Sequence, residues 1–543
     1  MKTIFSLLFC SILLPFTQPL TAKPRVVVNI VVSSLKADDL ARYATHFEEG
    51  GFRRLMEGGV YFPEGFFNYQ QTTTPVSLAT LTTGAMPSTH GVVCSHWRDY
   101  VENKTISLVA DPVAVGLDYP NGGGNFSPRN LIVPTLSETL ITFSPQSRIA
   151  TVAIDPQSSI VMSGRGGITF WMASECQWRS SSFYAPVLPN WVKKYNKEQA
   201  ATAYLLPAWQ TLLLDSVYHN TRRADILLTQ PDAKKKQSNS KREAGHIQTI
   251  SCTLSYKNNL DRMRYTPAGN TATFAFAKMA LTQLNLGTDT TPDLLNICLD
   301  APRYIAEAYG PESIEVEDMY YRLDRDLADF LTYLFAQVKP EETVVVLTSD
   351  HGTSASFDFG KEVRERFNVP QFEIILNSFL CARYGKGSWL LEYEDHMLYL
   401  NHNLIYEKGL SLADVQNEVA TFAMQFRGVS HALSATAMRT SYFGSGYAEK
   451  MQNSFYPRRS GDVMLNLMPG WIEERDNCRS CAGSMYGYDT RVPLLFYGGG
   501  LTPQKSTRKV DMTAVAPTTA ALLGIPEPAA SEGVRLNEII DKN

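Results

Sequence analysis

The sequence has few of the features that mark a membrane protein or a nucleic-acid-binding protein. After residue 22, no stretch reaches the ~18 consecutive apolar residues that a membrane-spanning helix needs, so we expect no transmembrane segment there. The formal net charge of -4 differs from the basic balance usual in a dedicated nucleic-acid binder, and we expect no nucleic-acid partner. With 44% hydrophobic and 19% charged residues, the composition excludes a disordered or collagen-like chain.

Cysteine is scarce, with eight residues among 543. Cys478 and Cys481 form a CxxC pair, and no second pair lies nearby in the sequence to complete a structural zinc site. We therefore interpret this pair as a local disulfide, which an oxidising compartment would allow. The other cysteines of the mature chain are scattered, and we expect them to be buried apolar residues.

The first 22 residues have the pattern of a secretory signal peptide. Lys2 precedes a mostly apolar run from Ile4 to Leu14, and Thr21 and Ala22 offer small residues for cleavage. This pattern predicts a signal peptide at 1–22, a mature chain at 23–543, and a periplasmic or secreted location. An uncleaved anchor is the alternative, although the apolar run is too short to span a bilayer comfortably.

Strand-like and helix-like patterns alternate along the mature chain. Short apolar runs of strand type lie at 26–32, 149–154, 294–299, 344–348 and 494–497. Apolar residues at helical spacing predict a helix from Val316 to Leu334 with Ser313 as its N-cap, and another amphipathic helix over 37–56. The alternation predicts an α/β sheet with helices on both faces. In such sheets, functional side chains gather at the carboxyl ends of the strands.

Two motifs place reactive side chains at such positions. The strand at 344–348 is followed by Asp350 and His351, whose side chains are good zinc ligands. A hydrogen-bonded turn is the alternative interpretation. The hydroxyl-rich segment 72–91 precedes and enters a helix, where amide donors and a positive dipole suit a threonine that attacks phosphorus or sulfur. An N-cap threonine without a chemical role is the alternative there.

Together with segments 488–498 and 510–526, these motifs resemble the alkaline phosphatase superfamily. The resemblance is to the exported bacterial phosphomonoesterases of the PafA type, which use a threonine nucleophile, and it runs from Val26 to Leu536. It implies a three-layer α/β sandwich with a mainly parallel central sheet and cap-like insertions at about 170–290 and 357–477. It also implies phosphomonoester hydrolysis at two zinc ions about 4 Å apart.

The resemblance assigns a role to ten positions, and most of them hold an unsuitable residue here. The nucleophile position holds Thr74, and two zinc-ligand positions hold Asp350 and His351. The other zinc-ligand positions hold Ser33, Arg303, Glu307 and Ala482, and the phosphate-binding positions hold Ser95, Asp155 and Gln157. An intact two-zinc centre is therefore not expected. If the alignment shifted by three residues, Asp300 would become an alternative carboxylate ligand.

Three hypotheses for the function follow. The first is a catalytically impaired member, a pseudophosphatase, in which Arg303 and Ser95 contact an anionic small molecule or the chain binds a periplasmic protein partner. The second is an active phosphate- or sulfate-monoester hydrolase that uses Thr74 and one zinc ion at a partial site formed by Asp350 and His351. The third is a structural secreted protein without a ligand. In all three, Arg303 and Glu307 are four residues apart and can pair on one helix face.

Overall fold

The computed structural model describes residues 23–206, 208–220, 251–253, 259–356, 365–475 and 478–540. The predicted signal peptide at 1–22 lies outside the described residues. Within the described ranges, no helix combines the length and the apolar character that crossing a membrane requires.

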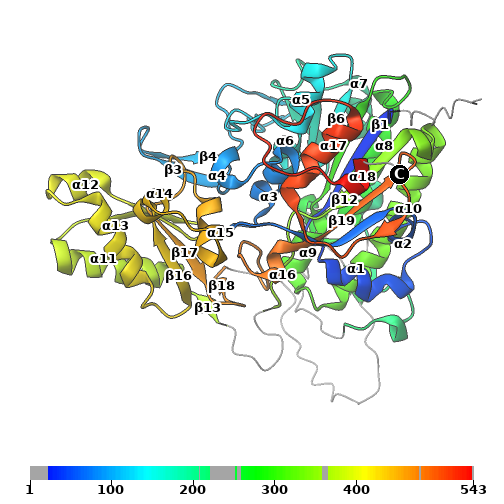
Figure 1. The fold of residues 1–543 in the computed structure, drawn as a ribbon. Coiled ribbons are helices and arrows are strands. Elements are labelled where there is room, and N and C mark those ends of the chain that lie inside the picture. Colours follow the sequence, from blue (N-terminus) through cyan, green and yellow to red (C-terminus); the bar gives the residue numbers. More distant parts are fainter. Residues whose placement is uncertain are drawn as a thin grey trace, which may run out of the picture.

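An eleven-stranded sheet forms the centre of the molecule (Figure 1). Its five middle strands run in the order β12-β1-β11-β6-β7, and every neighbouring pair among them is parallel. These strands are β12 (Thr343–Thr348), β1 (Val26–Val32), β11 (Asp293–Leu299), β6 (Ile149–Ala153) and β7 (Ile168–Met172). The mainly parallel sheet predicted from the sequence is confirmed.

The flanks of this sheet are partly antiparallel. On one side β12 pairs with β19, which pairs with β2, and on the other side β7 pairs with β8, which pairs with β5. Two short strands, β20 and β21, pair parallel with β2. The flanking strands are β19 (Arg491–Gly498), β2 (Val60–Phe66), β8 (Trp178–Ser181), β5 (Gly116–Leu117), β20 (Gln504–Lys505) and β21 (Val510–Asp511).

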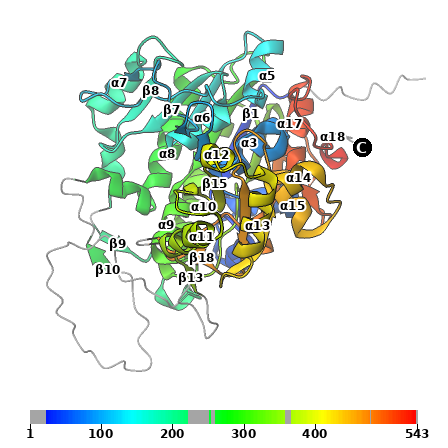
Figure 2. The same cartoon turned by 90° about the vertical axis from the view of Figure 1, so that its left-hand side faces the viewer.

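Helices cover both faces of the sheet and make the fold three-layered (Figures 1 and 2). Along β1, Val26, Val28 and Ile30 belong to one hydrophobic core, whereas Val27 and Val31 belong to the other, as the alternation of a strand requires. The first core includes residues of α8 (Ala268–Gln283), α9 (Ala301–Tyr309) and α10 (Ile314–Gln337). The second includes residues of α3 (Thr74–Thr83), α5 (Leu136–Phe143), α6 (Pro156–Ser163) and α17 (Val515–Leu523).

A second, four-stranded antiparallel sheet with its own core lies at one end of the molecule (Figure 1, yellow). Its order is β14-β15-β17-β16, with β14 (Leu390–Glu394), β15 (Met397–Leu400), β17 (Val463–Leu467) and β16 (Val429–Ser434). Five helices belong to this lobe: α11 (Val369–Tyr384), α12 (His402–Glu407), α13 (Leu412–Ala423), α14 (Ala435–Thr440) and α15 (Gly446–Ser454). The lobe falls within the insertion expected at about 357–477. The exact limits of that insertion, and of the one at about 170–290, stay predictions.

Shorter elements complete the described chain. They are α4 (Pro87–His90), β3 (His96–Asp99), β4 (Lys104–Ser107), α7 (Asn190–Lys197), β9 (Ala208–Gln210), β10 (Ser251–Thr253), β13 (Arg366–Phe367), β18 (Ile472–Glu473), α16 (Gly487–Thr490) and α18 (Asn537–Ile540), with six 3-10 turns. The prediction for α10 is confirmed at its start, because the Ser313 hydroxyl accepts a hydrogen bond from the Val316 amide at 3.3 Å.

The single helix predicted over 37–56 is wrong. The structure has α1 (Ala37–Tyr43), a 3-10 turn and α2 (Phe52–Gly58), with Gly50 and Gly51 between them. The carboxylate of Asp324 in α10 accepts hydrogen bonds from the amides of Glu48 at 2.6 Å and Phe52 at 2.7 Å. A Cβ atom on Gly51 would lie 2.2 Å from Asp324 Oδ1, so the close approach needs glycine. The Gly50-Gly51 pair and the buried carboxylate of Asp324 therefore meet at the start of α2.

Candidate active site

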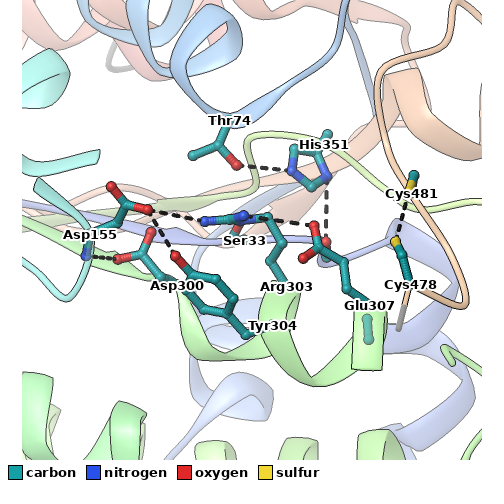
Figure 3. Close-up of polar contacts among 12 residues, drawn as sticks. Ser33, Thr74, Asp155, Asp300, Arg303, Tyr304, Glu307, His351, Cys478 and Cys481 are labelled. Carbon is teal, nitrogen blue, oxygen red and sulfur yellow. Dashed lines mark hydrogen bonds and ion pairs between the residues drawn. The ribbon is translucent and has the colours of Figure 1, made fainter. Parts of the chain in front are cut away.

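Four neighbouring strands of the central sheet end at the same edge and deliver polar side chains there (Figure 3). The residues that directly follow β1, β6, β11 and β12 include Ser33, Asp155, Asp300, Asp350 and His351. Because the strands are parallel, side chains that are distant in the sequence meet at one edge.

A cavity of about 920 Å³ lies at this edge. Of the positions to which the resemblance gives a role, eight line it: Thr74, Ser95, Asp155, Gln157, Arg303, Glu307, His351 and Ala482. Ser33 and Asp350 are fully buried and do not line the cavity. The predicted site residues are thus brought together in space, whatever roles they have.

Thr74 and His351 form a hydrogen-bonded pair. The Thr74 Oγ1 atom, on the first residue of α3, lies 3.1 Å from His351 Nε2. His351 Nδ1 lies 2.6 Å from the carbonyl oxygen of Gly352. Because a carbonyl oxygen can only accept, Nδ1 carries a proton, and in the neutral ring Nε2 accepts from the Thr74 hydroxyl.

Asp350 is held by the turn that follows β1. Its Oδ2 accepts a hydrogen bond from Ser33 Oγ at 2.7 Å, and its Oδ1 accepts one from the Ser34 amide at 3.1 Å. Ser34 has φ of 65°, an uncommon left-handed conformation for a residue other than glycine. The same Asp350 Oδ2 lies 3.4 Å from His351 Nε2. Both carboxylate oxygens are therefore engaged within the protein.

Arg303 lies between two carboxylates on the wall of the cavity (Figure 3). Its guanidinium is 3.5 Å from Asp155 Oδ2 and 3.7 Å from Glu307 Oε1, so the pairing predicted from helical spacing is confirmed. The hydroxyl of Tyr304 donates to Asp155 Oδ2 at 2.8 Å. Both ion-pair distances are long, and Arg303 Nε has no hydrogen-bond partner among the described residues. The Nε atom is itself buried, so its missing partner offers no donor to the cavity.

Asp300 does not occupy the position of a free ligand. It is fully buried, does not line the cavity, and accepts hydrogen bonds from Ser158 Oγ at 2.6 Å and the Asp155 amide at 2.9 Å. Burial raises the pKa of its carboxyl group, and the nearby Asp155 carboxylate raises it further. The geometry thus favours the alignment in which Arg303 and Glu307 stand at the ligand positions.

The residues present do not fit a two-zinc centre. In the part of the chain that the structure describes, no three His, Cys, Asp or Glu side chains form a group that could hold a metal ion. Arg303 adds a fixed positive charge, Ala482 offers no donor atom, and the Ser33 hydroxyl donates its hydrogen bond to Asp350. A partial set of possible ligands remains. In it, His351 Nε2 lies 3.1 Å from Thr74 Oγ1 and 3.4 Å from Asp350 Oδ2.

The positions to which the resemblance assigns phosphate binding supply no positive charge. Ser95 Oγ donates to Gln157 Oε1 at 2.9 Å, and both side chains are neutral. Asp155, on the same wall, would repel a phosphate dianion. In a phosphatase, this part of the site should attract the negative charge of the transferred group.

The predicted disulfide is not formed in the structure. Cys478 and Cys481 line the cavity as free thiols whose sulfur atoms are 2.8 Å apart, well beyond the ~2.05 Å of an S–S bond. Of the other described cysteines, Cys94, Cys176 and Cys298 are buried as expected, whereas Cys381 is half-buried.

Several residues of the cavity wall were missed by sequence reasoning. Glu394 and Asp395 come from the end of β14 and the turn after it, Arg475 follows β18, and Arg262 and Tyr265 come from a 3-10 turn before α8. No local motif marks these residues, because their place at the site depends on how the lobe packs against the central sheet.

Comparisons with known proteins agree with this geometry. The model of the type I phosphodiesterase/nucleotide pyrophosphatase family matches residues 27–489. A curated relative from Myroides odoratus, called a calcium-transporting ATPase, is 28% identical over 96% of this chain and 95% of its own length. Alkaline phosphatase PafA from Elizabethkingia meningoseptica is 28% identical over 96% of this chain and 95% of its own length.

The same relationship appears in three dimensions. A crystal structure of PafA superposes with a TM-score of 0.87 at 27% identity, covering 95% of this chain and 99% of that structure. Murine ectonucleotide pyrophosphatase/phosphodiesterase 5 has a TM-score of 0.52 at 12% identity, which supports a shared fold alone. The chain therefore belongs to the type I phosphodiesterase/nucleotide pyrophosphatase family of the alkaline phosphatase superfamily and is a protein of the PafA type.

Proposed function

We propose that this chain is an exported, catalytically impaired member of the family that binds a ligand in the cavity where its relatives carry out hydrolysis. The observation that carries this proposal is the position of Arg303 between Asp155 and Glu307. A guanidinium at a zinc-ligand position repels a dication, and a carboxylate at a phosphate-binding position repels the substrate. Loss of donors at Ser33 and Ala482 adds to the effect.

The ligand we propose carries an anionic group that meets the guanidinium of Arg303, which lines the cavity. Ser95 and Gln157 line the same cavity and can offer hydroxyl and amide contacts. A periplasmic protein partner is an alternative occupant of this surface. The proposal of export rests on the signal-peptide pattern at 1–22, which would direct the chain to the periplasm or to the outside of the cell.

The test is hydrolysis of p-nitrophenyl phosphate by the mature chain, from Lys23 onward, with added zinc. We expect no difference between this protein and its Thr74→Ala variant, because the zinc ligands that activate the nucleophile are largely absent. Turnover that requires both zinc and Thr74 would refute impaired catalysis. A parallel thermal melt with phosphate measures ligand binding independently, since an anion bound at Arg303 raises the melting temperature.

A second candidate function is a hydrolase with a reduced site, favoured by the contact between Thr74 Oγ1 and His351 Nε2 at 3.1 Å. A single zinc ion held by Asp350 and His351 could supply Lewis-acid assistance to attack on a phosphate or sulfate ester. An activated sulfate ester, p-nitrophenyl sulfate, should then be included in the assay. An unchanged rate in Thr74→Ala would remove this candidate.

A further inference from the structure

A smaller cavity of about 60 Å³ adjoins the main one. Both cavities are lined by Thr73, Asp395, Arg475, Cys481 and Ala482. The resemblance places a histidine at the position of Ala482. Because the alanine side chain ends at Cβ, it leaves room between the two cavities that an imidazole would take.

Three buried polar atoms on the wall of the smaller cavity lack hydrogen-bond partners among the described residues: the hydroxyl oxygen of Thr73 and two acceptor oxygens. Gln71 and Asp489 are each 1% exposed, and Gln71 Oε1 and Asp489 Oδ1 have no partner among the described residues. Gln71 Nε2 donates to the carbonyl oxygen of Asp395 at 2.9 Å, which fixes the amide orientation and leaves Oε1 as the free atom. The other oxygen of Asp489 accepts from the Ser484 amide at 2.9 Å. A buried acceptor without a donor is unfavourable, so the pair favours a ligand that donates.

The charged side chains around the smaller cavity also favour a ligand that donates hydrogen bonds, because one carboxylate there has no cationic partner in the part of the chain that the structure describes. Arg475 pairs with Glu473 at 2.7 Å and with Asp395 at 3.3 Å, and His396 lies 3.3 Å from Glu473. Within the described ranges, no cationic side chain comes within ion-pair distance of Asp489. Burial raises the pKa of Asp489 to about 7, so above that pH a positively charged donor would fit this carboxylate better than a neutral one.

Aromatic side chains complete the wall. Trp471, Tyr486 and Tyr488 line the cavity, and the rings of the two tyrosines have centroids 5.6 Å apart. Their hydroxyls are engaged, since Tyr486 donates to the Leu467 carbonyl at 2.8 Å and Tyr488 accepts from the Gly470 amide at 3.1 Å. Aromatic rings attract cations to their faces.

We infer that this smaller cavity is a subsite for a primary ammonium group, carried by the ligand that occupies the main cavity. The N–H groups of the ammonium donate to Gln71 Oε1 and Asp489 Oδ1, and the small volume selects an unsubstituted –NH₃⁺ head. The inference rests on the proposed function in one respect, that the main cavity binds a ligand. A ligand with an anionic group at Arg303 and an ammonium group here would be a zwitterion.

The subsite can be tested with methylammonium as the probe. We expect methylammonium chloride to raise the melting temperature of the mature chain, with the rise growing as the logarithm of concentration above Kd. Tetramethylammonium, which has no N–H to donate, and potassium should give no such rise at equal ionic strength. Equal effects of all three cations, or no effect of any, as expected if ordered water fills the cavity, would overturn the inference.

Two variants test whether the rise in melting temperature with methylammonium comes from binding in the smaller cavity. Asp489→Asn removes the charge and Gln71→Leu removes the amide oxygen, and each should abolish the methylammonium shift; either variant decides alone if the other fails to fold. Glu57→Gln, at a side chain that is 75% exposed in α2, is the matched control and should keep the shift. A shift that persists in both folded variants overturns the inference. The readout needs no hydrolysis, so failure of the subsite and failure of the proposed function remain distinguishable.

Discussion

The guanidinium of Arg303 lies 3.5 Å from the carboxylate of Asp155, and this contact joins α9 to the end of β6. The family resemblance places a metal-binding aspartate at the position of Arg303 and a phosphate-binding lysine at the position of Asp155. The two charges are therefore exchanged, and each residue neutralises the charge that the other brings into the site. Loss of metal and loss of phosphate affinity would then be linked changes.

This exchange predicts energetic coupling between the two side chains. Both are mostly buried, so we expect a double-mutant cycle of Asp155→Asn and Arg303→Met to give a coupling energy of about 1 kcal/mol or more in urea unfolding. Asparagine keeps the side-chain oxygen that caps α6 by accepting from the Gln157 amide, so the cycle reports the charge. Additive effects of the two substitutions would show that the contact contributes nothing to stability.

Restoring the family's ligand types should restore metal binding. A variant with Ser33→Asp, Arg303→Asp, Glu307→His and Ala482→His should bind zinc more tightly than the natural chain, because it adds three ligands near Asp350 and replaces the Glu307 carboxylate by an imidazole. Zinc stoichiometry after dialysis, with isothermal titration for affinity, measures the gain.

The control for this experiment is the same variant with Asp350→Ala added, which should lose much of the gained affinity. Tight binding of two zinc ions per chain by the natural protein would contradict our account of the site. In that case, donors outside the positions assigned by the resemblance would have to supply the ligands.

The sequence predicted the central strands well, because β-branched runs such as 26–32 are buried on both faces and leave little ambiguity. It also placed Thr74, Arg303 and His351 at one site, since parallel strand ends share an edge. It failed where a distant residue decides the outcome. The start of α2 is held by Asp324 in α10, and the wall residue Glu394 comes from β14 in the second lobe.

A second buried carboxylate of α10 predicts a large loss of stability. Asp318 is fully buried and accepts hydrogen bonds from Trp209 Nε1 at 2.7 Å, the Leu212 amide at 2.6 Å and Arg322 Nε at 2.7 Å. We expect Asp318→Ala to lower the free energy of unfolding by about 3 kcal/mol, because several buried donors lose their acceptor at once.

The matched control is Asp329→Ala on the same helix. The Asp329 side chain is 77% exposed and pairs with Lys278, and exposed ion pairs contribute about 1 kcal/mol or less. Equal losses in the two variants, measured by urea unfolding, would show that the buried network around Asp318 is not a source of stability.

The Asp324 carboxyl predicts a pH dependence of stability. Burial raises its pKa to about 6, against the opposing effect of the Phe52 and Glu48 amides. Because its pKa in the unfolded chain is about 3.9, the folded state binds the proton more tightly. The associated stabilisation is complete below pH of about 4 and is lost as the pH rises through about 6.

Asp324→Asn should remove this dependence. The unfolding free energy of the natural chain minus that of Asp324→Asn should fall by roughly 2 kcal/mol between pH 4 and pH 7, which urea titrations at several pH values can measure. Glu48 raises the Asp324 pKa and Arg53 lowers it, so Glu48→Gln tests whether a neighbour causes the slope. Asp326 also has its pKa raised to about 6, but it is present in both proteins and cancels in the difference. A difference that stays constant with pH would show that the Asp324 carboxyl is ionised in the folded state throughout this range.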